Sequence, residues 1–112
     1  MVLSSHEYLD LTTNTSANLF SDLLVHNNMR ALGDGIAQGI AGPNEFRTAP
    51  LWGLGQRMFF LHDGRTSDLN VAIQEHAAGG ADPGSEAQSV ITNFNSLATN
   101  NKQDLLNFLR SL

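Results

Sequence analysis

The stretch FLHDGRTSDLNVAIQEH, residues 60–76, decides the expected fold because it joins a tight polar turn to the clearest helix signal in the chain. Leu69, Ala72, Ile73 and His76 recur at the i, i+3, i+4 and i+7 positions of one helical face. This spacing predicts a helix with His76 on its buried face, fourteen residues after the histidine of the turn.

Both ends of this helix carry signals. Thr66 or Ser67 is the expected N-cap, and Asp68 falls in the first turn, where the helix dipole favours an acid. Gly79 follows the expected end, since glycine is common just past a helix C-terminus. The signals predict a helix of about three turns.

Two more helices are expected after a turn-rich connector. The first begins at a Ser85 cap and has an inner face of Val90, Ile91, Phe94 and Leu97. The last begins at a Thr99 or Asn100 cap and has an inner face of Leu105, Phe108, Leu109 and Leu112.

The first half of the chain is expected to be mostly irregular. Residues 1–18 form a polar lead-in segment, and residues 17–26, ANLFSDLLVH, predict a short amphipathic turn or helix. Residues 27–46 contain four glycines and a proline and predict a long loop, whereas residues 47–65 are apolar but interrupted by glycine and proline. No alternation predicts a strand, so the fold class is mainly α, with short helices and long irregular loops.

The composition limits the classes of function. The 112 residues carry a net charge of −5, which gives no basic surface for nucleic acid. The chain has no cysteine, which excludes disulfides, thiolate chemistry and a Cys-x-x-Cys-His haem attachment. The first ten residues lack the features of a secretory signal, and no apolar run approaches the roughly 20 residues of a membrane span. We therefore expect one small globular domain with no export signal and no membrane span.

Two interpretations of His76 are open. A histidine on an apolar helix face is most often a core residue bonded to a carbonyl. An imidazole in a last helical turn, beside a glycine-rich exit, also suits an axial ligand of iron.

The turn HDGR, residues 62–65, is equally open. Either Asp63 simply caps its own turn, or His62 makes a hydrogen bond near a bound cofactor. Three arginines close in sequence fit either a solvated patch or the anionic edges of a flat apolar ligand such as haem: Arg47, Arg57 and Arg65.

The sequence resembles a known family along most of its length. FRTAPLWGLGQRMFFLHDGRTSDLNVAIQEHAAGG, residues 46–80, is similar to the C-terminal half of di-haem cytochrome c peroxidase-like proteins, especially the di-haem oxidoreductase or thiol oxidoreductase branch. SDLLVHNNMRALGDG, residues 21–35, resembles the family's S-D-L-L-x-H-D-M-G, and DLLNFLRSL, residues 104–112, resembles its closing helix. The resemblance implies that residues 19–112 are the C-terminal haem-domain portion, with a partial class I cytochrome c-like fold.

The resemblance also implies a site and a function. The residue fourteen after the HDG histidine is the distal axial ligand of the C-terminal haem, a position held here by His76. The residues expected to line the haem, or the seam to the second haem domain, are Arg47, Thr48, Trp52, His62 and Arg65. The expected function is the haem-binding, electron-transfer portion of a periplasmic di-haem c-type oxidoreductase, peroxidase-like, that is not active alone.

The chain departs from the family pattern at three points. It has no Cys-x-x-Cys-His, Asn27 follows His26 where the family has aspartate, and Ala49 replaces the first proline of R-T-P-P. We therefore expect a fragment, a split subunit or a degenerate stand-alone protein. Its partners would be the haem-carrying segment, a small electron-donor protein and further copies of itself. The alternative is a haem-free helical structural or interaction module derived from the family.

Overall fold

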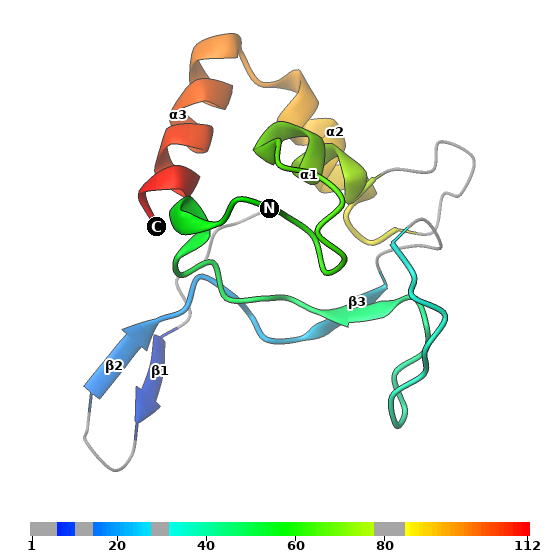
Figure 1. Ribbon diagram of the computed structural model, residues 1–112. Helices are drawn as coiled ribbons and strands as arrows, with labels where there is room; N and C mark the ends of the chain where they lie inside the picture. Colours follow the sequence, from blue (N-terminus) through cyan, green and yellow to red (C-terminus); the bar gives the residue numbers. More distant parts are fainter. Residues whose placement is uncertain (1–6, 11–14, 28–31, 78–84) are drawn as a thin grey trace.

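The computed structural model describes residues 7–10, 15–27, 32–77 and 85–112 (Figure 1). Three helices carry most of the regular structure, as the mainly-α prediction requires, and two short antiparallel strand pairs accompany them. In chain order the elements are β1 (Glu7–Asp10), β2 (Thr15–Asn18), β3 (Val25–Asn27), β4 (Glu45–Arg47), the 3-10 helix η1 (Leu54–Gln56), α1 (Leu69–Glu75), α2 (Gln88–Ser96) and α3 (Thr99–Ser111).

Helix α1 occupies the predicted stretch, but its N-cap is Asp68 and not Thr66 or Ser67. The Asp68 carboxylate accepts hydrogen bonds from the backbone N–H groups of Asn70 at 2.8 Å and Val71 at 3.1 Å. A carboxylate is a strong acceptor for these otherwise unpaired donors, and the Thr66 hydroxyl instead accepts from the Asp68 N–H. The predicted C-terminal Gly79 lies outside the described residues.

Helices α2 and α3 confirm the two downstream helices and correct their caps. Ser85 lies before the first turn of α2, where its hydroxyl accepts from the Ala87 N–H, and Ala87 itself is the N-cap. Ala98 precedes α3, so Thr99 is the first helical residue. The predicted inner faces are correct at Ile91, Phe94 and Leu109, whereas Leu97 and Phe108 are exposed.

Of the two alternatives for residues 17–26, a short turn or a short helix, the helix is wrong. Phe20 and Leu23 have left-handed backbone angles, with φ of 50° and 54°. The Ser21 hydroxyl accepts from the Leu23 N–H, and the Asp22 carboxylate accepts from the Leu24 N–H. These local bonds compete with helical ones, so the chain turns here instead of coiling.

The expectation of no strands is also wrong. β1 pairs with β2 as a hairpin within the 1–18 segment, and β3 pairs with β4 in a register that places His26 opposite Phe46. Each strand has only three or four residues, which is too short to display an alternating pattern. Loop residues 32–44 and the apolar segment 48–65 are irregular as predicted, apart from η1 and two isolated bridges.

The helices gather on one side of the β3–β4 pair, and the β1–β2 hairpin projects away from them (Figure 1). The buried apolar residues of the described ranges come mainly from the helices: Leu32, Leu69, Ala72, Ile91, Phe94 and Leu109. The radius of gyration of 15.0 Å exceeds the roughly 13 Å of a compact domain of this length. The core is therefore thin, and α1 stands at its centre.

The end of α3 is joined to the irregular segment around η1. The Gly53 N–H donates to the Leu112 carbonyl at 2.9 Å, and a Cβ at Gly55 would overlap the Arg110 carbonyl oxygen. Glycine at 55 thus permits a backbone-to-backbone approach. Among the helices of the described ranges, none has the length and apolarity to cross a bilayer.

Candidate functional site

His76 ends α1, and its side chain folds back onto the same helix. The residue retains helical backbone angles (φ −67°, ψ −18°), and its ring Nδ1 lies 2.8 Å from the Ala72 carbonyl oxygen. A carbonyl oxygen only accepts, so Nδ1 carries the proton. In the neutral ring Nε2 then holds an available lone pair, which no hydrogen bond or ion pair from the described residues engages.

The other two described histidines have their Nε2 atoms occupied. His26 Nε2 lies 2.9 Å from Asp22, and its Nδ1 lies 2.6 Å from Glu86. His62 Nε2 donates to the Leu32 carbonyl at 2.6 Å, and its ring stacks on Phe46 with centroids 4.7 Å apart. Within the described part of the chain, His76 Nε2 and His62 Nδ1 are therefore the imidazole nitrogens that no hydrogen bond engages. Of the two residues, His76 is the one that the sequence predicts as a metal ligand.

The HDGR turn is closed by its own residues. The Asp63 carboxylate accepts from the Arg65 N–H at 3.2 Å and from the Arg65 guanidinium at 2.7 Å, which holds the pKa of Asp63 below its usual value. Leu61 and Gly64 adopt positive φ angles of 70° and 67°. The Phe60 N–H donates to the Thr66 backbone carbonyl at 2.7 Å. This is the geometry of an aspartate that caps its own turn.

Arg65 connects this turn to the helix that carries His76. Its guanidinium lies 3.7 Å from the Glu75 carboxylate, one residue before His76. His62, by contrast, contacts Phe46 on β4, so the two histidines of the 60–76 stretch face different neighbours.

The remaining predicted residues do not gather at His76. Arg47 ends β4 opposite Val25, Thr48 donates its N–H to the Leu24 carbonyl, and the Trp52 side chain is 52% exposed. Among the described residues, no hydrogen bond, ion pair or ring contact joins any of these three to His76. Among the ion pairs of the described residues, one links a predicted cofactor-lining residue to the chain beside His76. It joins Arg65 to Glu75.

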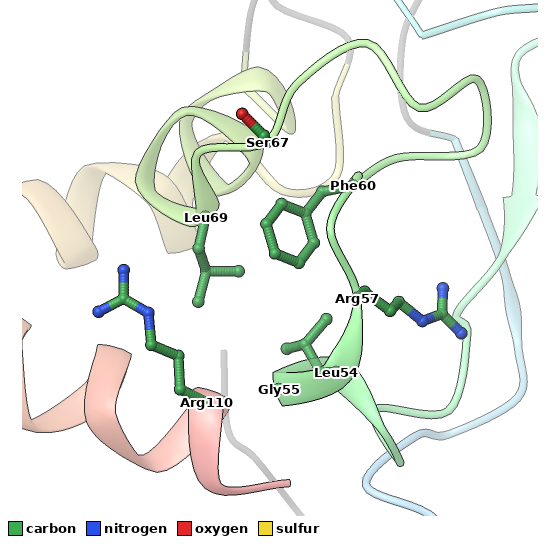
Figure 2. A pocket seen from close by; sticks show the side chains of 7 residues that line it. All are labelled: Leu54, Gly55, Arg57, Phe60, Ser67, Leu69 and Arg110. Atoms are coloured by element: carbon green, nitrogen blue, oxygen red, sulfur yellow. The ribbon is translucent and has the colours of Figure 1, made fainter.

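A cavity of about 200 Å³ lies between η1, the start of α1 and the end of α3 (Figure 2). The side chains of Leu54, Phe60 and Leu69 point into it, whereas the Arg57 guanidinium points away. It is smaller than the roughly 300–1,000 Å³ of typical ligand sites, and none of the six predicted site residues lines it. This cavity cannot enclose a porphyrin.

One cluster escaped the sequence prediction. His26 lies between the carboxylates of Asp22 and Glu86, which raise its pKa above 6.5, chiefly through the Glu86 hydrogen bond. The Leu24 N–H and His26 lower the pKa of Asp22 to about 2, and His26 lowers that of Glu86. The spacing of four residues between Asp22 and His26 could have indicated their contact from the sequence. No sequence pattern indicates the contact of His26 with Glu86, which is sixty residues away. The described residues contain no group of three metal-binding side chains.

The geometry defines a small helical protein with a candidate metal-ligand histidine at the end of a short helix. Residues 4–112 match the family model described as "Di-haem oxidoreductase, putative peroxidase", and the chain belongs to this family. No curated protein and no solved structure matches the chain in the corresponding comparisons.

Proposed function

We propose that this chain is the electron-transfer portion of a di-haem oxidoreductase, peroxidase-like, in which His76 provides the distal axial nitrogen to one haem iron. The observation that carries the proposal is the hydrogen bond from His76 Nδ1 to the Ala72 carbonyl. Histidine ligands of metals usually donate their second nitrogen to such an acceptor, which fixes the tautomer and aims the other nitrogen. Membership of the di-haem family supplies the cofactor class.

The donor set fits one axial position of a haem, and haem when bound supplies one-electron chemistry. His76 would hold the ligating nitrogen, and the Arg65–Glu75 ion pair would steady the last turn of α1. Exposed apolar side chains such as Met58 and Phe59, 75% and 62% exposed, offer surface for a flat ring or for a partner segment.

The proposal extends to the partners. Because this chain has no cysteine, covalent attachment of the haem and the opposite axial ligand would come from a haem-carrying segment outside the sequence. Residues 19–112 would pack against that segment in a class I cytochrome c-like arrangement. We also propose a small electron-donor protein as a partner and the periplasm as the location.

A second candidate function is a haem-free helical structural or interaction module. The observation that favours it is that the cavity of about 200 Å³ between η1, α1 and α3 is too small for a porphyrin. The exposed apolar loop residues would then be the surface for a protein partner.

Haemin titration of the purified chain separates the two functions. We expect a Soret band with low-spin features in the wild-type chain and its loss in His76→Ala. His62→Ala is the competing variant, because His62 Nδ1 is the other described histidine nitrogen that no hydrogen bond engages; the band should survive this change if His76 is the ligand. The far-ultraviolet circular dichroism of each variant checks that the chain stays folded.

Equal haemin spectra in the wild type and in folded His76→Ala would refute the ligand assignment. A flat spectrum for every variant, with and without the haem-carrying segment, would leave the helical module as the function.

A further inference from the structure

We propose that Ser85 is the positioning residue of His76, and that Ser85 and Glu86 together form a bracket between the end of α1 and β3. The inference rests on the proposed function, because it assigns the residue that orients the proposed ligand. Ser85 is one of two buried polar residues in the described ranges, with 7% exposure.

The Ser85 hydroxyl is fully engaged at the end of α1. It donates to the His76 carbonyl oxygen at 2.8 Å and accepts from the Ala87 N–H at 3.1 Å. The last carbonyls of a helix have no partner within the helix, so an outside donor adds to the backbone bonds that the His76 and Ala77 N–H groups make in the last turn. Ser85 is the outside donor to the carbonyl of His76, the candidate ligand.

The adjacent Glu86 anchors the other side of the bracket. Its N–H donates to the Asn27 carbonyl at 3.1 Å, and its carboxylate accepts from the Asn27 N–H and binds His26 at 2.6 Å. Because Ser85 and Glu86 are neighbours in the chain, fixing Glu86 on β3 also fixes the Ser85 hydroxyl.

The orientation of the His76 ring depends on this bracket. Helix α1 has only seven residues, and so short a helix is not stable without tertiary contacts. While the Ser85 bond helps to keep His76 in its helical angles, the ring Nδ1 reaches the Ala72 carbonyl and Nε2 stays unprotonated. Without the Ser85 bond the last turn opens more often, and the ring loses its fixed tautomer for part of the time.

A second link between α1 and α2 provides a matched control. Gln74 and Asn95 exchange side-chain hydrogen bonds of 2.6 and 3.1 Å on the exposed surface. Asn95→Ala therefore loosens the two helices from each other without touching the His76 carbonyl.

The test compares Ser85→Ala, Ser85→Thr and Asn95→Ala in two measurements. The first is nitrogen-15 NMR of the His76 ring in the chain without haemin, at a pH about two units above the ordinary histidine pKa. We expect Ser85→Ala to convert part of the Nδ1–H tautomer to the Nε2–H form that predominates in free imidazole side chains. Ser85→Thr, which keeps the hydroxyl, and Asn95→Ala should resemble the wild type.

The second measurement is haemin affinity, which should weaken roughly tenfold in Ser85→Ala, as is typical when an orienting partner of a metal ligand is removed. A changed tautomer with no haemin binding in any variant would support the bracket and overturn the proposed function. An unchanged tautomer in folded Ser85→Ala would overturn the bracket. If Ser85→Ala does not fold, Ser85→Val, which has nearly the shape of Ser85→Thr but no donor, replaces it, and a wild-type tautomer there overturns the bracket.

Discussion

The close approach of Gly55 to α3 yields a stability prediction of defined size. In Gly55→Ala the added Cβ overlaps the Arg110 carbonyl oxygen, a backbone atom that cannot rotate away. Overpacking of this kind costs about 1–3 kcal/mol. Replacing glycine returns about 0.4–1 kcal/mol by restricting the unfolded chain. We expect a net loss of about 1–2 kcal/mol in the free energy of unfolding, or roughly 5–10 °C in Tm.

Urea unfolding followed by circular dichroism measures this loss, provided that the slope m stays constant. Gly42→Ala is the matched control, because its Cβ would lie 3.5 Å from the Glu45 carboxylate oxygen, an ordinary contact. The control should equal or slightly exceed the wild type in stability. If Gly55→Ala is as stable as Gly42→Ala, the close packing of η1 on α3 is refuted.

Two further predictions concern the described side-chain bonds. Asp68→Ala removes the N-cap of α1 and should lower the free energy of unfolding by about 1 kcal/mol, measured by the same urea titration; an unchanged midpoint would contradict this cap. The His26 cluster should give a stability optimum in pH. His26 has a raised folded pKa, so its contribution is complete below 6.5 and is lost as the pH rises through that folded value. Asp22 and Glu86 have lowered folded pKa values, so their contributions are complete above their unfolded values of 3.8 and 4.5 and are lost at lower pH. Tm should therefore peak between about 4.5 and 6.5 and flatten in His26→Gln; equal profiles for the two chains would count against the cluster.

The helical half of the fold could be predicted from sequence because its signals are local. The apolar period of α1, α2 and α3 placed Ala72, Ile91 and Leu109 in the core, as observed. The N-terminal half was harder to predict. The apolar period at residues 17–26 is compatible with a helix, but the side-chain-to-backbone bonds of Ser21 and Asp22 stabilise a turned backbone instead.

The candidate site was predictable only in part, for a similar reason. The helical period and the family resemblance selected His76, but both pointed to a helix face and not to the direction of a ring nitrogen. The partners that set this direction are the Ala72 carbonyl, four residues back, and Ser85, nine residues ahead. The carboxylate pair around His26 depends on a contact over sixty residues, for which a single sequence holds no pattern.

The Asn27–Glu86 pairing connects β3 to the start of α2, and it also has a consequence for the order of folding. It closes a segment of 59 residues, and a closure of this length costs about 3–4 kcal/mol of chain entropy before any contact offsets it. The pairing should therefore form late, after α2 and α3 have condensed and after the rate-limiting step of folding. Glu86→Ala, which removes the carboxylate that accepts from the Asn27 N–H, should then speed unfolding more than it slows refolding, and stopped-flow kinetics would reveal this.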